Sequence, residues 1–531
     1  MELRRFWGLG LSATLAVIAT SPHVLAQPAE PAEPVEGAGG APAPAEVELD
    51  EAPAPPPEPE VTAAPEAPPT TAPQPRGNGG PPSPPNEGAR KQPLRLEYPR
   101  GSFSFGSYGR VIAAGDLRGG RGRDADIVAH GARIDEGSYG ELELTRDDEW
   151  EDGIHSRVVS TLAIGEPIFH DSGSFDATIA LRNFYVEERG VLDPGLSAWV
   201  GSRMYRGDDI YLLDFWPLDN LNTVGGGLKF SFNEDRSFVA WHVGMNLVDD
   251  PFQQQSVLRP AAQNQPGTDR IPLLDRPRTI SSLKLSHIFP MAGKAGLKAV
   301  LYGEVHNLPS GERELDDGRR EDLPGDSGAV VGGQVGGFSG EDGTFANLFV
   351  RYATGLAAYG EFSTPEGTSE SSDVSGAHEL LIGLSGNWDS RWASVLVGGY
   401  FRSFRDASPE KFRFDNVDEG IFVVRPQVYF TDHLGLALEG SYQAQQRGVL
   451  STVDNQPLMA SLWRFGVMPF ISPAGRGSFK RPRLRLIYVL TGRDAGARSL
   501  YPNTDPFARR QTEQFFGVGA EWWFNSSSYG Q

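Results

Sequence analysis

The chain has no cysteine among its 531 residues. This absence excludes disulfide bonds, thiolate metal sites and a lipid anchor on an N-terminal cysteine, and it is compatible with an oxidising compartment. Beyond the first residues the chain also lacks the run of about 20 apolar residues that a membrane-spanning helix requires. A helical membrane protein is therefore excluded.

Positive charge is scarce, with 48 Lys and Arg residues against 69 Asp and Glu residues and a formal net charge of −21. Nucleic-acid binding requires clustered Lys and Arg, and the sequence contains no such cluster. A nucleic-acid partner is therefore excluded. The 39% of hydrophobic residues and the 64 glycines are still compatible with a large folded domain.

The first 26 residues have the pattern of a signal peptide. Arg4 and Arg5 precede an apolar run over 6–20, and Val24-Leu25-Ala26 places small residues at the positions that a signal peptidase reads. The alternative, an N-terminal membrane anchor, is disfavoured because the apolar run is too short. The pattern predicts export from the cytoplasm.

Residues 27–96 are rich in Pro, Ala and Glu and contain no aromatic side chain. Such a segment cannot bury enough apolar surface to offset the entropy of ordering it, so we expect a disordered periplasmic linker. It is either a spacer that reaches toward the cell wall or a low-complexity insert without a partner. Neither interpretation gives it a chemical role.

From residue 97 onward the hydrophobic pattern has a period of two, which is typical of strands with one apolar and one polar face. Arg481, Arg483 and Arg485 share the polar face of one such stretch. Arginines in a sandwich core would each need a buried partner, whereas in a water-filled barrel they cost little. The first stretch places Phe103, Phe105, Val111 and Ala113 on the apolar face and Ser104, Gly106, Tyr108 and Arg110 on the polar face.

The connections between these stretches alternate in length. Short turns such as Asp389-Ser390-Arg391 and Thr431-Asp432-His433 contrast with long loops expected over 249–278 and 308–337. This asymmetry is typical of outer-membrane β-barrels. The sequence therefore predicts an all-β fold, an antiparallel transmembrane β-barrel over 97–531, in the outer membrane of a Gram-negative-type bacterium and in contact with its lipid.

Two stretches point to a sugar channel. In the last expected strand, 515–524, alternation directs Glu521 and Trp523 into the lumen. The stretch 201–228 mixes aromatic rings with both signs of charge, which favours a loop folded into the barrel over a loop in bulk water. Sugars present hydroxyls to charged groups and C–H faces to rings, so such a lumen suits them.

The same residues resemble the maltoporins and related sugar-specific porins. The resemblance is densest from Trp199-Val200-Gly201-Ser202-Arg203-Met204-Tyr205 to Gly225-Gly226-Gly227-Leu228. It is also carried by Phe105-Gly106-Ser107-Tyr108-Gly109-Arg110, by Ser138-Tyr139-Gly140-Glu141-Leu142-Glu143-Leu144, by Ser478-Phe479-Lys480-Arg481-Pro482 and by Glu521-Trp522-Trp523. These segments cover both ends of 97–524.

The resemblance implies an 18-stranded barrel, a homotrimer and an inward third loop that narrows the pore. It also implies an aromatic slide for sugars, on Tyr108, Tyr139, Phe479 (where the family has Trp) and Trp523, and a polar track on Arg110, Arg133, Glu141, Arg182 and Asp214. In the third loop, Tyr205 to Gly227, Trp216 takes the place of a constricting tyrosine, and Arg203, Tyr205 and Asp209 are further sugar-contacting candidates.

The expected function is facilitated diffusion of maltodextrin-like or related sugars and of small ions. Two alternatives stay open: a general porin without sugar selectivity, and a barrel enzyme with a Ser-His-acid site near the rim. The enzyme is disfavoured because no G-x-S-x-G or paired-His motif is present. No catalytic residue, cofactor or metal site is predicted, and the partners are a carbohydrate substrate and further copies of the chain.

Overall fold

The computed structural model describes residues 100–165, 167–173, 175, 177–260, 266–339, 343–365, 368–369, 371–407, 416–450 and 455–527. The predicted signal peptide (1–26) and linker (27–96) lie outside the described residues. Within these ranges, no helix is long and apolar enough to cross a membrane.

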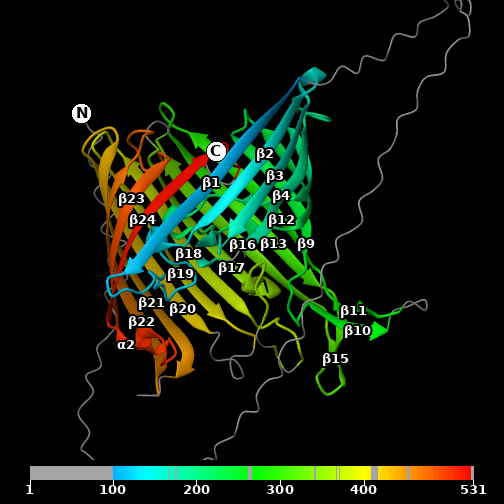
Figure 1. Ribbon diagram of the computed structural model, residues 1–531. Helices are drawn as coiled ribbons and strands as arrows, with labels where there is room; N and C mark the ends of the chain where they lie inside the picture. Colours follow the sequence, from blue (N-terminus) through cyan, green and yellow to red (C-terminus); the bar gives the residue numbers. More distant parts are fainter. Residues whose placement is uncertain are drawn as a thin grey trace, which may run out of the picture. The chain divides into compact units, whose positions relative to one another are not determined.

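Eighteen strands form one antiparallel sheet that closes on itself (Figure 1), because the last strand pairs with the first. The predicted all-β barrel of 18 strands is thereby confirmed, and closure leaves the sheet no edge with unpaired backbone groups. Its strands are β1 (Arg100–Asp116), β2 (Tyr139–Glu149), β3 (His155–Gly165), β4 (Thr178–Arg189), β5 (Leu196–Ser202), β8 (Val224–Phe232), β9 (Ser237–Asn246), β12 (Arg278–Pro290), β13 (Gly296–Leu308), β16 (Asp326–Phe338), β17 (Phe345–Gly355), β18 (His378–Asp389), β19 (Ala393–Arg405), β20 (Val417–Tyr429), β21 (Leu434–Leu450), β22 (Pro457–Ile471), β23 (Arg483–Arg493) and β24 (Thr512–Phe524).

The remaining elements lie in the connections. Asp494 and Asp505 cap the two short helices by accepting hydrogen bonds from backbone N–H groups of the first turn. The elements are the strands β6 (Tyr205–Arg206), β7 (Asn220–Leu221), β10 (Gln254–Pro260), β11 (Thr268–Asp275), β14 (Gly311–Glu314) and β15 (Arg320–Leu323), the 3₁₀ turns η1 (Arg133–Asp135), η2 (Glu151–Gly153), η3 (His170–Ser172), η4 (Tyr211–Leu213) and η5 (Leu356–Tyr359), and the helices α1 (Ala495–Ser499) and α2 (Pro506–Arg509).

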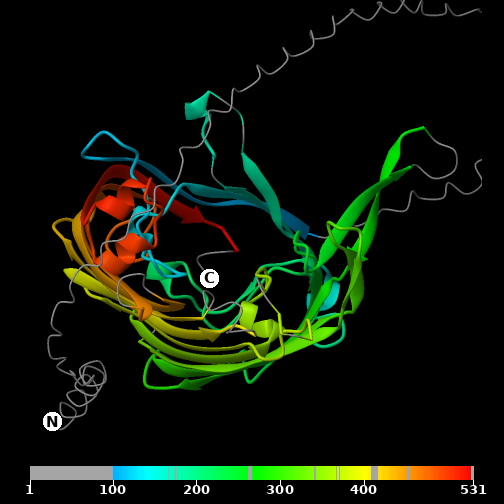
Figure 2. The ribbon, with the colours of Figure 1, turned by 90° about the horizontal axis from the view of Figure 1, so that it is seen from below.

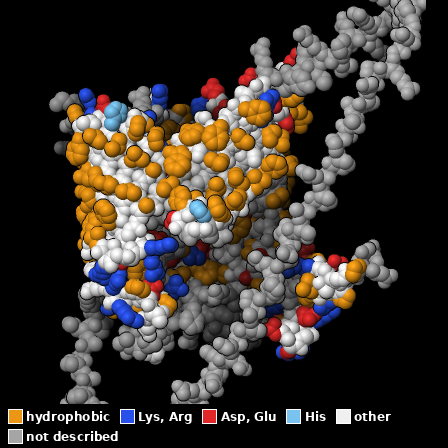
Figure 3. Space-filling view, in the orientation of Figure 1, with side chains coloured by type: hydrophobic (Ala, Val, Ile, Leu, Met, Phe, Trp, Pro, Cys, Tyr) orange, Lys and Arg blue, Asp and Glu red, His pale blue; other side chains and the backbone are white. Residues whose placement is uncertain are grey.

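The two faces of the barrel wall differ as alternation predicts. Apolar side chains spread over the outer wall on the face that Figure 3 shows, and a water-soluble protein rarely leaves so much apolar surface exposed. They are called the outer band below. On the inside, buried polar and charged side chains take the alternate positions. Exposed members of the outer band include Phe103, Phe105, Leu142, Leu144, Phe184, Leu301, Val331, Phe422, Leu484, Phe516, Val518 and Phe524.

The two ends of the barrel also differ. One end carries short turns, such as 150–154, 233–236 and 390–392, and the other carries long loops that hold β10, β11, β15 and α2 (Figure 1). The loop expected over 308–337 is shorter, because β16 already begins at Asp326 and includes glycines that do not break the alternation. The loop expected over 249–278 ends at β12 and contains its own hairpin.

β5 ends at Ser202, where the chain leaves the wall for the lumen. One strand boundary differs from the expected one. The strand predicted from Arg481 begins only at Arg483. Arg182 is the extra residue of a β-bulge, which shifts the alternation along β4: Thr161 pairs with Asn183, while Leu162 pairs with Leu181.

Two connections from the long-loop end fold into the barrel: the first loop (117–138) and the third loop (203–223). Figure 2 shows the ring of strands from the long-loop end, with parts of both loops inside it. Their apolar side chains form one buried cluster with residues of β13, β17, β18, β19, β20 and β22. The core of this barrel is therefore built by loops packed against the inner wall.

Candidate functional site

The third loop crosses the lumen and turns back at Asp214. Ile210 donates its backbone N–H to the carbonyl of Phe215 at 2.7 Å, and η4 lies between these two residues. Asp214 closes the turn in the left-handed region, with φ of 48°, which Asp tolerates better than most residues. The inward loop predicted from the sequence is present in this form.

Apolar contacts hold the tip of the loop against the opposite wall. Ile210 and Leu212 are buried, at 0% and 1% exposure, in the cluster shared with β18, β19 and β20. Gly398 on β19 makes room for them, because a Cβ there would lie 2.7 Å from Cγ2 of Ile210. Burying one such side chain stabilises the packed position of the loop by about 1.5–3 kcal/mol, so the tip is held firmly against the wall.

Ion pairs fix the two limbs of the loop. Lys284 Nζ lies 2.6 Å from Asp219, and Lys298 Nζ lies 2.7 Å from Asp208. The guanidinium of Arg206 lies 3.9 Å from the ring centre of Trp216, which is buried. Neither lysine was predicted, although each follows the alternation of its strand onto the inner face.

Several predicted polar-track residues meet in one buried network between the two loops and the wall. Arg110 pairs with Glu136 at 2.6 Å and with Asp214 at 3.4 Å. Arg133 donates to the Tyr108 hydroxyl at 2.6 Å and pairs with Glu521 at 3.3 Å. The charges therefore compensate one another in the lumen.

Glu521 is the centre of this network. It accepts hydrogen bonds from Arg481 at 2.9 Å and from the Tyr211 hydroxyl at 3.1 Å, in addition to its pair with Arg133. One carboxylate of the last strand thus binds the first loop, the third loop and the turn before β23. On a neighbouring part of the wall, Glu141 accepts from Arg182 at 2.6 Å and from the Tyr139 hydroxyl at 2.7 Å.

Aromatic rings form a row along the inner wall beside this network. The Tyr139 and Tyr108 ring centres are 5.9 Å apart, and Tyr108 pairs with Trp523 across β1 and β24. Tyr211 then lies 6.2 Å from Trp523 and 5.3 Å from Phe479, and Phe479 lies 6.1 Å from Phe345. The four predicted slide positions therefore belong to one row, to which Tyr211 and Phe345 add two rings that were not predicted from the sequence.

A cavity of about 910 Å³ opens on the short-turn side of the third loop. Six predicted residues line it: Arg203, Tyr205, Asp209, Trp216, Phe479 and Trp523. Tyr108, Arg110, Arg133, Tyr139, Glu141, Arg182 and Asp214 are instead held in the two networks above. The other residues that line this cavity of about 910 Å³ include Phe238, Phe338 and Phe345. These three residues occupy inward positions beside the short turns, so the alternation of their strands predicts them.

A second cavity, of about 520 Å³, lies on the long-loop side. Its lining includes Tyr359, Arg402, Glu419 and Tyr501, which come from the long loops and from the strand ends next to them. Residues of the first loop line this cavity, and residues of the third loop line the cavity on the short-turn side.

Burial raises the pKa of Asp209 to about 7. The positive charge of Arg133 lowers this pKa, and the negative charges of Asp214 and Asp208 raise it. Asp209 is therefore mostly neutral at about pH 6 and mostly charged at about pH 8. Because it lines the cavity, we expect the cation preference of the channel to rise over this range and Asp209→Asn to abolish the rise. Reversal potentials in a salt gradient at the two pH values measure the change in cation preference. An unchanged pH dependence in Asp209→Asn would show that Asp209 is not the titrating group.

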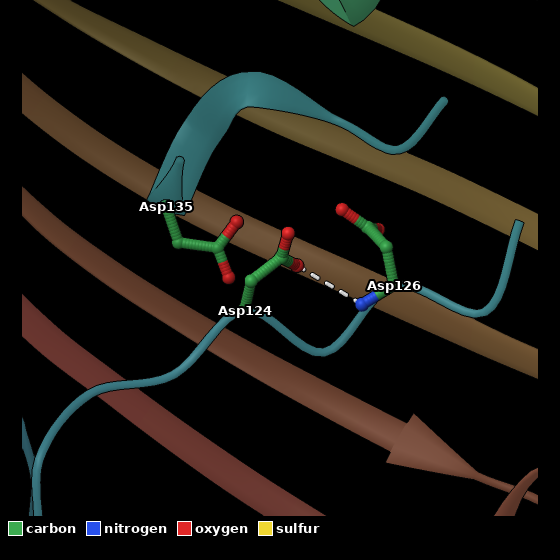
Figure 4. Close-up of side chains that lie close together, drawn as sticks. All are labelled: Asp124, Asp126 and Asp135. Atoms are coloured by element: carbon green, nitrogen blue, oxygen red, sulfur yellow. Dashed lines mark hydrogen bonds between the residues drawn. The ribbon is translucent and has the colours of Figure 1, made fainter. Parts of the chain in front are cut away.

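Three carboxylates of the first loop gather beside β22 (Figure 4). Each of Asp124, Asp126 and Asp135 offers an oxygen within 4.8 Å of the others, and Asp126 donates its backbone N–H to Asp124 at 2.9 Å. Arg464 pairs with Asp126 at 2.5 Å and also with Asp135. Burial raises the pKa of Asp124 to about 8 and that of Asp135 to about 6, so the arginine meets fewer than three charges at neutral pH. We assign the cluster to fixing the first loop.

Three solved structures match this chain at low similarity. OccAB1 of Acinetobacter baumannii is 10% identical, with a TM-score of 0.40, over 80% of this chain and 96% of its own. OmpT of Vibrio cholerae, in a trimer form, and OpdK of Pseudomonas aeruginosa are each 10% identical, with a TM-score of 0.38, over 80% of this chain and 99% of theirs.

The sequence model of the LamB porin family matches residues 103–524. This range begins at the fourth residue of β1 and ends at the last residue of β24, so it includes both inward loops and the other 17 strands in full. The chain belongs to the LamB porin family.

Proposed function

We propose that this outer-membrane channel carries sugars, of the maltodextrin type or related oligosaccharides, by facilitated diffusion. The observation that carries the proposal is the row of aromatic rings from Tyr139 to Phe345 along the inner wall, with arginines and carboxylates beside it. Small ions would pass by the same route. The family and the barrel point to a channel rather than to an enzyme.

The chemistry of a sugar fits such a wall. Its C–H face packs on an aromatic ring, and its equatorial hydroxyls donate to carboxylates and accept from guanidinium groups. The rings that line the short-turn cavity, Tyr205, Trp216, Phe479 and Trp523, supply the first kind of surface. The charged groups of Arg203, Asp208, Asp209 and Lys298 supply hydrogen-bond partners for the hydroxyls in the same cavity.

The test is planar-bilayer recording with a panel of oligosaccharides. A sugar channel shows a concentration-dependent block of the ion current by chain-like glucosyl oligosaccharides, with weaker block by single sugars of equal mass concentration. The competing function is a general porin, which also follows from the barrel and the charged lumen. Equal, unsaturable passage of all small solutes would establish that function and exclude ours.

We also propose that the channel assembles as a homotrimer. Residues 97–531 are expected to be recovered from outer membranes as a species that migrates as a trimer in detergent and dissociates only on heating, because closed barrels unfold reluctantly in lipid. Migration before and after boiling, together with mass measurement in detergent, gives the result. Recovery of a monomer under both conditions would defeat the proposal.

A further inference from the structure

The chain does not end with its last strand. β24 stops at Phe524 at the short-turn end of the barrel (Figure 1), and Asn525 then reverses the chain with φ of 47°, in the left-handed region. Ser526 is buried, at 8% exposure, and Ser527 is partly buried. The first residues of the tail therefore turn inward, into the lumen.

Hydrogen bonds attach this tail to the inner wall. Ser527 donates its backbone N–H to Glu143 Oε1 at 2.9 Å and its hydroxyl to Oε2 of the same carboxylate. Thr161 donates to Glu143 at 2.7 Å from the next strand, and Asn525 donates its side-chain amide to the carbonyl of Phe105 at 3.2 Å. Glu143 is 2% exposed, so a buried charge of the wall depends on the tail for two of its hydrogen bonds.

The wall is shaped to receive the tail. A Cβ on Gly106 would lie 2.1 Å from the carbonyl oxygen of Asn525 and 2.7 Å from its carbonyl carbon. Gly106 belongs to the inward-facing set of β1, between Ser104 and Tyr108. The close approach of the two backbones thus requires the absence of a side chain at this position.

The tail lines two neighbouring cavities of the lumen. Ser527 lines the cavity of about 910 Å³ that also contains Trp523 and Phe479. Asn525, Ser526 and Ser527 line a neighbouring cavity of about 430 Å³. A solute that leaves the aromatic row toward the short turns therefore passes these three residues.

We propose that Asn525–Ser527 form a second restriction of the channel, on the short-turn side of the third loop. The tail narrows that mouth and presents hydroxyl and amide groups to the hydroxyls or waters of hydration of a passing solute. This inference requires only that the barrel conducts, so it is independent of the sugar proposal.

The first experiment removes or displaces the tail. A protein that ends at Phe524 is expected to have a higher single-channel conductance than the full chain. Gly106→Ala in the full chain is expected to raise the conductance in the same direction, because its methyl group displaces Asn525. In the shortened protein, Gly106→Ala is expected to change nothing further. Equal conductance of the shortened and full proteins would overturn the proposal.

The second experiment does not depend on how the shortened barrel assembles, and it uses the absence of natural cysteines. Ser527→Cys is treated with a membrane-impermeant sulfonate-bearing methanethiosulfonate during recording. The current is expected to fall in steps, because the added group occupies the lumen. Asp432→Cys, in an exposed turn at the same end, is the matched control and is expected to keep its current after labelling. An unreactive thiol in Ser527→Cys, or full labelling of this variant without a fall in current, would refute the inference.

Discussion

Replacing Leu212 by aspartate is expected to release the third loop and to raise the ion conductance of the channel several-fold. Leu212 is 1% exposed in the apolar cluster that joins the loop tip to β18, β19 and β20. A carboxylate at this position has no partner in an apolar cluster, and its burial costs more than the roughly 2–5 kcal/mol of a large-to-small core substitution. The loop therefore leaves the wall rather than bury the charge.

Single-channel recording in planar bilayers measures the effect, and proteolysis of the loop reports its release. Leu212→Met is the matched control, because it conserves volume and is expected to keep the wild-type conductance. The limbs of the loop stay attached through Lys284 and Lys298, so the barrel itself is expected to remain assembled. A wild-type conductance in Leu212→Asp would show that the third loop does not limit the current.

Replacing Trp523 by alanine is expected to weaken sugar binding several-fold while ion conductance stays equal or rises slightly. Trp523 lines the short-turn cavity, and its ring packs near Tyr211 and under the guanidinium of Arg481 at 4.3 Å. Stacking of a sugar on such a ring is worth about 1 kcal/mol by analogy with aromatic pairs, and about 1.4 kcal/mol is a factor of ten. The dissociation constant should rise accordingly.

The measurement is the concentration dependence of the sugar-induced current block. Trp522→Ala is the matched control: the same substitution one residue earlier, on the outer face, where the indole donates to Ser107 at 3.0 Å. It is expected to leave the block unchanged, whereas Phe479→Ala is expected to weaken it as Trp523→Ala does. Block at wild-type concentrations in Trp523→Ala would remove the main physical support for the sugar proposal.

The alternation of the strands identifies lumenal side chains that were not among the predicted site residues. Phe345, Lys284 and Lys298 occupy inward positions on strands whose pattern is regular, so counting parity from a known inward residue finds them. Arg182 cannot be placed in this way. The β-bulge inserts one residue opposite Thr161 and Leu162, and a bulge shifts the parity without a composition signal of its own.

The barrel follows from patterns along the chain. Side chains two residues apart share a face, so the alternation of apolar and polar residues specifies the lipid-facing and lumenal sides strand by strand. The lengths of the connections specify its two ends, and the mixture of aromatic rings and charges in 201–228 indicates a loop inside it.

The contacts between lumenal groups depend instead on the folded structure. Arg110 reaches Asp214 across 104 residues, Tyr211 reaches Glu521 across 310, and Ser527 reaches Glu143 across 384. Such contacts depend on how each loop folds back against a wall that is complete only when β24 pairs with β1. No local pattern records that closure. The network of compensated charges, the row of rings joined by Tyr211 and the inward tail therefore emerge only from the folded barrel.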